Sequence, residues 1–588
     1  MKKQKLSHYL VRYWYFYAIA IFCMAVQIVL DMLSPQVTKR IIDDVLGKGQ
    51  SEIFPGLLLI IFVVGAGRCV AGYWKEFLFD CTGFRIGVDF RRNLFLHIQG
   101  LGADYFDRTN TGELMSRLKD DVDKISNAAG YVGMLMIEVT LHTCIVLTCM
   151  FRMSRRLFVI PLVAMPFIGI MAVLLERRLD KTYSDISEEN AVLNTVAQEN
   201  LSGVHTVKAF AREKFEIQKF LSHNKRYYEL NMSQSKALVR YQPIFKMMTY
   251  LLPMGALVCG GIFVIDESMT LGTLGAFAEY CTNIVWPMEM LGWLLNEMAA
   301  AVASNKKVQK IYSQEPSIKE IKEPVPLPEI RGKVEFDHVV WKMGGKNILK
   351  DVSFVLPEGK TLGIMGETGS GKTSIIQLLQ RFFNVTEGEI RLDGVPIQKL
   401  SLYTLRSAIA PVMQEVFLFS DTISSNVSLG CEGKIDDMTI QESLEKACAW
   451  EFVAHLEEEK ETVIGERGVG LSGGQKQRIS MARAFVRKAP ILVLDDATSA
   501  LDTETERQIQ KNLSQMKGKT KIIIGHRISS VCGADEILVL EDGKVTERGT
   551  HKSLLEKKGY YYRTYQAQYG DALSDSGRKG DGERCRSI

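Results

Sequence analysis

The hydrophobic and polar positions divide the chain into two unlike parts. Before about residue 310, apolar stretches recur at close to the roughly 20 residues that a helix needs to cross a bilayer. After residue 330, short apolar runs alternate with helical patterns, which is typical of an α/β domain in water. The predicted spans are Trp14 to Leu33, Phe54 to about Trp74, Tyr131 to Phe151, Leu157 to Leu175, Pro243 to Ile265 and Leu274 to Leu295. The pattern therefore predicts a membrane domain of six transmembrane helices followed by an α/β domain.

The connections between the predicted spans differ in length. Those on the outer side are short, whereas the two inner ones run to roughly 55–65 residues and carry periodic, charged patterns without Gly/Pro clusters. The segment Glu188 to Phe220 is one example. We therefore expect helices to continue well beyond the membrane into the cytosol.

Charge predicts the orientation of the spans. Basic residues precede the first span and enrich the inner connections, 85–125 and 176–240, which places the N-terminus in the cytosol by the positive-inside rule. The basic residues at the N-terminus are Lys2, Lys3, Lys5 and Arg12. Three arginines of an outer loop oppose the rule, namely Arg152, Arg155 and Arg156. No small-residue cleavage site follows the first apolar run, so we interpret it as a retained helix and not a signal peptide.

Prolines mark the boundary between the two domains. The stretch Glu315 to Glu329 contains four of them, which predicts an extended linker. They are Pro316, Pro324, Pro326 and Pro328. We place the membrane domain at 1–312, the linker at 313–330, the α/β domain at 331–569 and a disordered tail at 570–588, where the residues are small, polar and charged.

Composition sets two further limits. The net charge of the 588 residues is only +4 and no basic nucleic-acid patch stands out, so a DNA- or RNA-binding role is disfavoured. The 11 cysteines are scattered, without CxxC or zinc-like spacing. We therefore expect no disulfide framework.

A glycine-rich loop follows the short apolar strand Thr361 to Met365. It matches GxxxxGK[ST], and the helical pattern Ser374 to Phe383 comes after it, as a phosphate-binding loop requires. Glycines let successive N–H groups aim at phosphates, while Lys372 adds a positive charge and the Thr373 hydroxyl is suited to Mg²⁺. The predicted ATP-binding residues are Gly366, Glu367, Thr368, Gly369, Ser370, Gly371, Lys372, Thr373 and Ser374.

A second buried-strand pattern, Pro490 to Leu494, ends in Asp495 and Asp496. A carboxylate at the end of such a strand is suited to hold Mg²⁺ through water, and Asp495 fits this role. In isolation, an Asp pair at a strand end is more often a helix cap or a solvated turn. The phosphate loop on the same chain favours the magnesium interpretation.

A third motif, Leu471 to Gln475, opens a helical pattern. Ser472 is a good N-cap, and Gly473 and Gly474 allow a backbone to approach a ligand closely. The free N–H groups of Ser472, Gly473, Gly474 and Gln475 therefore predict an anion site. Because the chain already has a phosphate loop, we expect this site to contact the γ-phosphate of ATP bound to another subunit.

Together these motifs resemble an ATP-binding cassette (ABC) exporter, and the resemblance covers almost the whole chain. The combination of GETGSGKT, LSGGQ and ILVLDD in one chain is very specific to this family. The resemblance implies that Gln414 is the Q-loop glutamine that senses Mg²⁺, that 499–502 is the D-loop, and that His526 is the switch histidine. It implies Thr373, Gln414 and Asp495 as magnesium ligands, and Asp496, His526 and Gln414 as the catalytic residues. It also implies export across the plasma membrane by a dimer.

Three further segments resemble those through which an exporter's two domains communicate. The segments Phe106 to Asp123 and Glu199 to Glu216 resemble the two intracellular loops, whose short helices dock on nucleotide-binding domains. Glu466, Arg467 and Gly468 resemble the segment that these loops touch. The resemblance therefore implies that ATP binding is coupled to the membrane helices through these segments.

The chain departs from the family pattern at two positions. Asp496 stands where efficient members carry Glu, and its carboxylate reaches about 1.5 Å less far, a misplacement that costs around 10²-fold in rate. At the position of the aromatic residue that stacks on adenine, the alignment gives Met343, with Trp341 two residues earlier. The sequence leaves open which of the two contacts adenine.

An altered carboxylate beside an intact LSGGQ is, in this family, typical of one half of a heterodimer. The resemblance then implies a degenerate ATP site on this chain and a partner half-transporter with the usual Glu. A homodimeric exporter or lipid flippase with two slow, equivalent sites is the alternative. A soluble cassette protein is disfavoured by the six spans, and an ATP-gated channel stays open.

Ionisable residues within the predicted spans are candidates for contact with cargo. They are Arg68, Glu138, His142 and Glu279. Hydrogen bonding between helices is an equally good explanation of each. We expect a hydrophobic or amphipathic substrate, and the sequence leaves drug, lipid and peptide open.

Overall fold

The computed structural model describes residues 6–327, 329–431, 433, 435–465, 468 and 470–574. The chain forms two compact units, a helical one of Met1–Gly100 with Thr109–Glu315 and an α/β one of Leu101–Arg108 with Pro316–Ile588. The short helix α4 (Ala103–Arg108) thus belongs with the α/β unit, where Asp104 accepts a 2.6 Å hydrogen bond from the Ser317 hydroxyl. The main division between the units falls after Glu315, and the assignment of Leu101–Arg108 to the α/β unit has no counterpart in the predicted domain limits.

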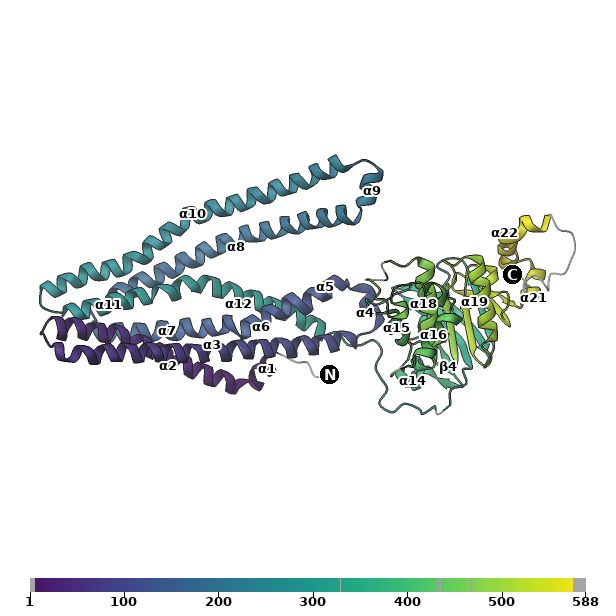
Figure 1. Cartoon of the computed structure of the whole chain (residues 1–588), viewed down its shortest axis with the longest axis horizontal. Coiled ribbons are helices and arrows are strands. Elements are labelled where there is room, and N and C mark those ends of the chain that lie inside the picture. The colour runs from purple at the N-terminus through teal and green to yellow at the C-terminus, as the bar shows by residue number, and fades with distance from the viewer. Residues whose placement is uncertain are drawn as a thin grey trace. The chain divides into compact units, whose positions relative to one another are not determined.

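The helical unit consists of long helices joined by short turns (Figure 1). They are α1 (Leu6–Arg12), α2 (Trp14–Arg40), α3 (Phe54–Gln99), α5 (Thr111–Ser116), α6 (Val122–Ala129), α7 (Tyr131–Met153), α8 (Val159–Ser202), α9 (Val204–Ala209), α10 (Glu213–Ile265), α11 (Leu271–Asn283) and α12 (Val285–Tyr312). Two π-helical turns, η1 (Ile41–Leu46) and η3 (Arg117–Asp121), and a 3-10 turn, η2 (Ser51–Ile53), complete the unit. Figure 1 shows α9 at the tip of the hairpin that α8 and α10 form.

The helices of this unit are long enough to extend beyond a membrane, as the sequence predicts. Helix α10 has 53 residues, which at 1.5 Å per residue is about 80 Å, far more than the roughly 30 Å of a bilayer core. By length and composition, four helical stretches among the described residues are suited to span a membrane: Trp14–Leu46, Ser51–Gln99, Thr111–Met153 and Glu213–Ile265. The predicted fourth span corresponds to the shorter apolar stretch Val159–Leu174 of α8. The sixth is interrupted at Ile284, where α11 gives way to α12.

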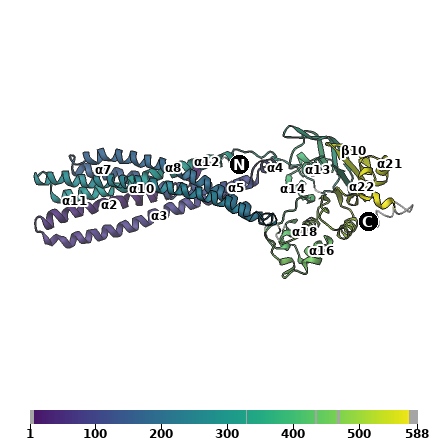
Figure 2. The same cartoon turned by 90° about the horizontal axis from the view of Figure 1, so that it is seen from above.

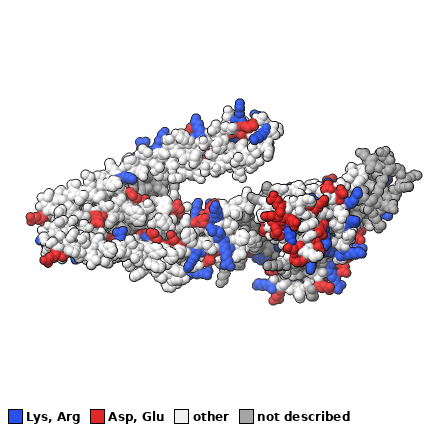
Figure 3. Space-filling view, viewed as in Figure 1, with Lys and Arg blue, Asp and Glu red and all other residues white. Residues whose placement is uncertain are grey.

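The helical unit has closely approaching backbones inside and an apolar outer surface. Helices α2 and α3 lie side by side (Figure 2). A methyl group on Gly83 of α3 would lie 2.8 Å from the Gly130 Cα, so only glycine permits this approach. Much of the outer surface is apolar and exposed, as Phe62 and Phe167 illustrate, and Figure 3 shows few charges on the visible face of α2, α3 and α7. Such a surface is typical of helices that face lipid.

The α/β unit contains two sheets. Strands β3 (Thr361–Gly366), β6 (Ile409–Val412), β7 (Ile491–Asp495), β8 (Thr520–Ile524), β9 (Glu536–Glu541) and β10 (Lys544–Gly549) form the larger one. Its order is β10-β9-β3-β8-β7-β6, parallel except for β10. The smaller, antiparallel sheet has the order β2-β1-β4-β5, from β1 (Val334–Met343), β2 (Lys346–Leu356), β4 (Glu387–Leu392) and β5 (Val395–Pro396).

Helices cover the larger sheet and enclose its buried strands. They are α13 (Lys372–Leu379), α14 (Leu402–Ser407), α15 (Ile423–Ser428), α16 (Asp437–Lys446), α17 (Trp450–Val453), α18 (Gly473–Phe485), α19 (Thr503–Gln515), α20 (Ile528–Val531), α21 (His551–Lys557) and α22 (Tyr560–Ser574), with 3-10 turns Ile397–Lys399 and Glu459–Glu461. Helix α22 runs into the predicted tail, and 575–588 lie outside the described residues. The predicted architecture, a domain of long helices suited to span a membrane followed by an α/β domain, agrees with these two units.

Candidate functional site

The predicted site residues follow the carboxyl ends of neighbouring parallel strands. The phosphate loop follows β3, His526 follows β8 and Gln414 follows β6, while Asp495 ends β7 and Asp496 comes directly after it. Pairing of Ile524 with both Ile364 and Asp495 fixes the register of the three central strands. In open parallel sheets, ligands bind outside these strand ends. The fold thus brings these predicted residues to one edge of one sheet.

Two glycines of the phosphate loop have no room for a side chain. Gly366 has φ +147° and a Cβ there would collide with the Leu540 carbonyl oxygen, while Gly371 has φ +98° and its Cβ would lie 2.7 Å from Leu349. Gly369 has φ +83° in open space, so its conformation and not crowding favours glycine. The loop therefore keeps its backbone N–H groups at the sheet edge, as a phosphate cradle requires.

Lys372 lies over this loop. Its side chain is only 6% exposed, and Nζ donates hydrogen bonds to the carbonyl oxygens of Gly366 at 2.9 Å and Glu367 at 2.6 Å. Burial lowers the pKa of the Lys372 ammonium, while Asp495 and Asp496 oppose this shift. A cation held in this way is placed to neutralise phosphate charge.

Asp495 has the properties of a magnesium ligand. It is 2% exposed, burial raises its pKa, and a hydrogen bond from Thr373 opposes that shift. Its Oδ2 and the Ser370 hydroxyl are buried without a hydrogen-bond partner among the described residues. Unsatisfied oxygen atoms beside a phosphate loop fit Mg²⁺, which prefers oxygen ligands and takes several of them from phosphate and water.

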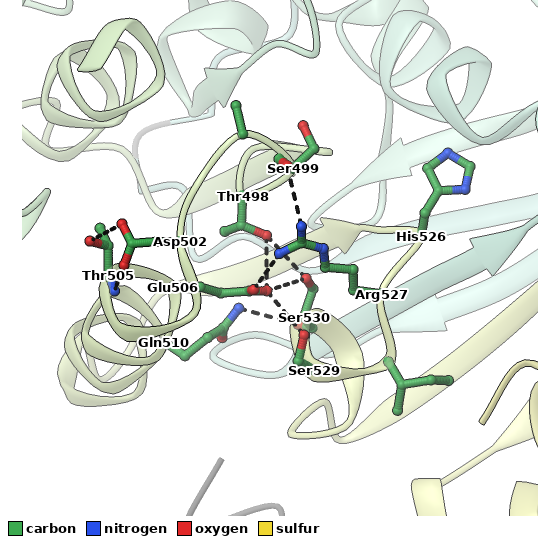
Figure 4. Close-up of polar contacts among 12 residues, drawn as sticks. Thr498, Ser499, Asp502, Thr505, Glu506, Gln510, His526, Arg527, Ser529 and Ser530 are labelled. Carbon is green, nitrogen blue, oxygen red and sulfur yellow. Dashed lines mark hydrogen bonds and ion pairs between the residues drawn. The ribbon is translucent and has the colours of Figure 1, made fainter. Parts of the chain in front are cut away.

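Asp496 is fixed through its main chain. Its φ is +48°, its N–H donates to the Ile524 carbonyl oxygen at 3.0 Å, and its carbonyl oxygen accepts from the Ser499 hydroxyl at 2.9 Å. The side chain is half-buried. Those of His526 and Gln414 are exposed, and Figure 4 shows the His526 ring directed away from the polar cluster around Glu506. The carboxylate of Asp496 therefore extends from a backbone that has little freedom to move.

The LSGGQ motif begins α18 with a capping box. Ser472 accepts a hydrogen bond from the Gln475 N–H at 3.3 Å, and its own N–H donates to Gln475 Oε1 at 2.8 Å. Gly474 lies so close to loop 499–502 that a Cβ would be 2.9 Å from the Ala500 carbonyl oxygen. The motif is thus preorganised and contacts the D-loop segment. Glu466 and Arg467 lie outside the described residues.

The two candidates for adenine contact occupy different environments. Trp341 is 4% exposed and packs in the core, with its ring centroid 5.0 Å from that of Phe383. Met343, at the end of β1, is half-buried. Packing in the core accounts for Trp341, so Met343 is the better candidate.

Sequence reasoning missed three polar residues that surround the D-loop segment. Gln477 donates to the Ser499 hydroxyl at 3.1 Å and accepts from the Ala500 N–H at 3.1 Å. Arg527 donates to the Glu506 carboxylate at 3.0 Å (Figure 4). Each lies within or next to a motif or its helix, but only the fold brings them together.

The ionisable residues within the spans have partners that the sequence did not reveal. The ammonium of Lys75 donates to both Glu138 oxygens at 2.9 Å, in the buried interior of the helical unit. Arg68 pairs with Asp31 at 2.7 Å. His142 packs against Trp286 with ring centroids 6.5 Å apart. In α11, Glu279 accepts from the Ser34 hydroxyl at 3.4 Å.

Comparison with known proteins gives matches along almost the whole chain. The family model "ABC transporter transmembrane region" matches residues 17–288, and the model "ABC transporter" matches 349–499. The chain is 36% identical over 556 residues to the uncharacterized ABC transporter ATP-binding protein YknU of Bacillus subtilis (strain 168), covering 94% of this chain and 95% of that protein.

Other relatives carry descriptions that name a cargo. Identity is 33% over 582 residues to the multidrug resistance-like ATP-binding protein MdlA of Escherichia coli (strain K12), covering 97% of each chain. It is 32% over 555 residues to an ATP-dependent lipid A-core flippase of Syntrophus aciditrophicus (strain SB), covering 94% of this chain and 92% of the flippase.

The solved structure of a bacterial Atm1-family ABC exporter with ATP bound matches with a TM-score of 0.78 at 25% identity, covering 94% of this chain and 99% of that one.

Proposed function

This chain belongs to the ABC transporter family, as an exporter half-transporter with fused membrane and ATPase domains, and we propose from this premise that it is the degenerate-site half of a heterodimer. The family establishes a multi-pass membrane protein that couples ATP hydrolysis to export. Half-transporters act as dimers. The identity of the second chain is part of the proposal.

In this proposal ATP binds at the carboxyl ends of the parallel strands, beside the loop that follows β3. Residues 366–374 hold the phosphates, with Lys372 as the neutralising cation. Thr373, Gln414 and Asp495 hold Mg²⁺, which spreads the negative charge of the phosphates when it is bound. The unpartnered Oδ2 of Asp495 supports this assignment.

The observation that carries the degenerate-site proposal is the fixed backbone of Asp496. Hydrogen bonds to Ile524 and from Ser499 hold both main-chain polar groups, so the backbone has no easy movement to extend the short carboxylate. Hydrolysis at this chain's own site is then slow, since a base must lie within hydrogen-bond reach of the attacking water. His526 positions the γ-phosphate at this site.

The intact LSGGQ motif serves the other site of the dimer. Its capping box uses the N–H groups of Ser472 and Gln475. The N–H groups of Gly473 and Gly474, in the first turn of α18, are then the ones that this chain offers to a γ-phosphate on the partner. This chain would therefore contribute little to its own hydrolysis and much to its partner's. A homodimer with two slow, equivalent sites is the second candidate, supported by the complete phosphate loop and by His526.

Orientation and cargo complete the proposal. The N-terminus and the nucleotide unit lie in the cytosol, because Lys and Arg enrich the segments predicted to be inside, and the membrane is the plasma membrane. The cargo is a hydrophobic or amphipathic molecule, a class consistent with relatives named for multidrug resistance and for lipid A-core flipping.

The subunit composition of the native assembly tests this proposal. The tagged chain is purified from its own membranes and its partner identified by mass spectrometry, and ATPase activity is compared between wild type and Asp496→Asn. A heterodimer yields one second half-transporter, and Asp496→Asn changes total ATPase by less than about twofold, since the partner's site does most of the work. Recovery of this chain alone, with most activity lost in Asp496→Asn, would establish the homodimer. The exposed residue Asp437 provides the control Asp437→Asn.

A further inference from the structure

A buried carboxylate lies behind the nucleotide site, on a residue to which none of the motifs assigns a role. Glu506 of α19 is 5% exposed, and both of its oxygens have partners (Figure 4). Oε1 accepts hydrogen bonds from the hydroxyls of Thr498 at 3.2 Å, Ser529 at 3.1 Å and Ser530 at 3.0 Å. Oε2 accepts from Arg527 at 3.0 Å. A buried carboxylate is tolerated only with such complete satisfaction, so the whole cluster is fixed together.

We propose that Glu506 is a positioning residue that joins the segment carrying His526 to the D-loop segment 499–502, and through it to the LSGGQ motif. The inference rests on the proposed roles of His526 and of Ser472–Gln475. It adds that movement at one nucleotide site is transmitted to the other through this one chain.

The first link runs from His526 to the D-loop segment. Arg527 follows His526 directly, and its guanidinium bridges the Glu506 carboxylate and the Ser499 carbonyl oxygen, at 3.0 and 3.4 Å. Gln568 holds the main chain on both sides, donating to the His526 carbonyl oxygen at 2.9 Å and accepting from the Ile528 N–H at 2.9 Å. A displacement of His526 therefore also displaces Arg527 and, through its hydrogen bond, Ser499.

The second link runs from the D-loop segment to the N-terminus of α18. The buried Gln477 bonds to both the Ser499 hydroxyl and the Ala500 N–H. Gly474 contacts the Ala500 carbonyl, with space for no more than its hydrogen. Because close packing transmits displacement, a shift of 499–500 reorients the LSGGQ motif.

The test is a double-mutant cycle in the full-length native assembly, reconstituted in lipid. Glu506→Gln keeps an oxygen for the three hydroxyls but turns an amide N–H toward Arg527, and Arg527→Gln removes the bridge from the other side. Each should lower the kcat of ATP hydrolysis by about tenfold, because a charged hydrogen bond is lost. The KM for ATP should change by less than about twofold, since neither residue belongs to the phosphate loop.

The double variant and the control give the decisive readouts. If the two residues act as one link, the double variant loses about tenfold in kcat, and not the roughly hundredfold expected of independent sites. The matched control is Glu504→Gln, the same change on an exposed residue of the same helix, which should keep wild-type kcat. Thermal unfolding of every variant shows whether a loss of activity follows a loss of folded protein.

Three outcomes would overturn the inference: kcat values within twofold of the control, losses that add in the double variant, or losses that simply track the folded fraction. If Glu506→Gln does not fold, Arg527→Gln, at a half-exposed residue, tests the inference by itself. It should lower kcat about tenfold and leave the KM for ATP nearly unchanged. Failure of the heterodimer proposal is distinguishable, because it appears in the subunit composition and not in the kinetics of these variants.

Discussion

Lengthening the carboxylate of Asp496 by one methylene, in Asp496→Glu, should raise ATP hydrolysis at this chain's own site by about 100-fold. The backbone there is fixed by hydrogen bonds of 3.0 Å to Ile524 and 2.9 Å from Ser499, so the reach of the side chain determines where the base lies. One added carbon–carbon bond supplies about 1.5 Å. A 100-fold gain corresponds to about 2.7 kcal/mol of activation free energy.

The same substitution has a small structural cost that needs its own control. Asp496 has φ +48°, a region that Asp tolerates better than Glu, so the variant should unfold at a slightly lower temperature. Asp542, at the turn between β9 and β10, has nearly the same φ of +47° and a highly exposed side chain. Asp542→Glu therefore measures the cost of Glu at this φ in a position that keeps a carboxylate for its partner Lys350, and it should leave hydrolysis unchanged.

Steady-state ATPase of the purified assembly measures the gain. In a second variant that also carries Lys372→Ala, the gain should vanish, because the new activity depends on this chain's own phosphate loop. If folded Asp496→Glu hydrolyses ATP no faster than wild type, carboxylate reach is not what limits this site. The degenerate-site proposal would then need another physical cause.

Three further variants test the remaining assignments. Lys372→Ala should weaken binding of a fluorescent ATP analogue at this chain's own site by about 10–100-fold, because a charge-assisted contact is lost; the exposed Lys360→Ala is the control, and unchanged affinity would contradict the assignment. Gly474→Asp should abolish nearly all ATPase and transport, because its Cβ would crowd Ala500 and its carboxylate would repel phosphate; if most hydrolysis survives while Asp496→Asn loses it, the roles of the two sites are reversed. Trp341→Ala should lower the free energy of unfolding of the α/β unit by about 3–5 kcal/mol in chemical denaturation, and a loss of ATP affinity without destabilisation would show a binding role instead.

Local patterns explain what could be predicted from the sequence. The phosphate loop lies between a strand and a helix that are both contiguous with it, so its place in the fold follows from one short segment. Asp495 could be placed at a strand end because the apolar run before it is fully buried in β7. The long inner helices followed from periodic, charged segments without helix breakers. The roles of the individual site residues stay predictions.

What the sequence could not reveal depends on contacts between distant segments. Glu506 stands among other polar residues of α19 and resembles a solvated position, because its burial is created by 527–530. Lys75 and Glu138 become partners only when α3 packs against α7. The burial of Trp341 depends on Phe383, which follows the phosphate-loop helix. The interruption at Ile284 lies three residues before Pro287, whose missing N–H and ring disfavour a continuous helix there; the hydropathy pattern of the predicted sixth span did not take this signal into account.

The strand order of the larger sheet has a consequence for synthesis of the protein. Among the strands that the structure describes, β3, which carries the phosphate loop, pairs with β8 and β9 alone, and β8 begins at Thr520, about 150 residues later. At roughly 5–20 residues per second, a ribosome needs about 8–30 s to make that stretch. During this interval β3 is an apolar strand without neighbours, at risk of aggregation and of capture by chaperones. The loop acquires its supporting strands only after β8 and β9 have been made, so ATP binding requires a chain that has been synthesised at least as far as β9.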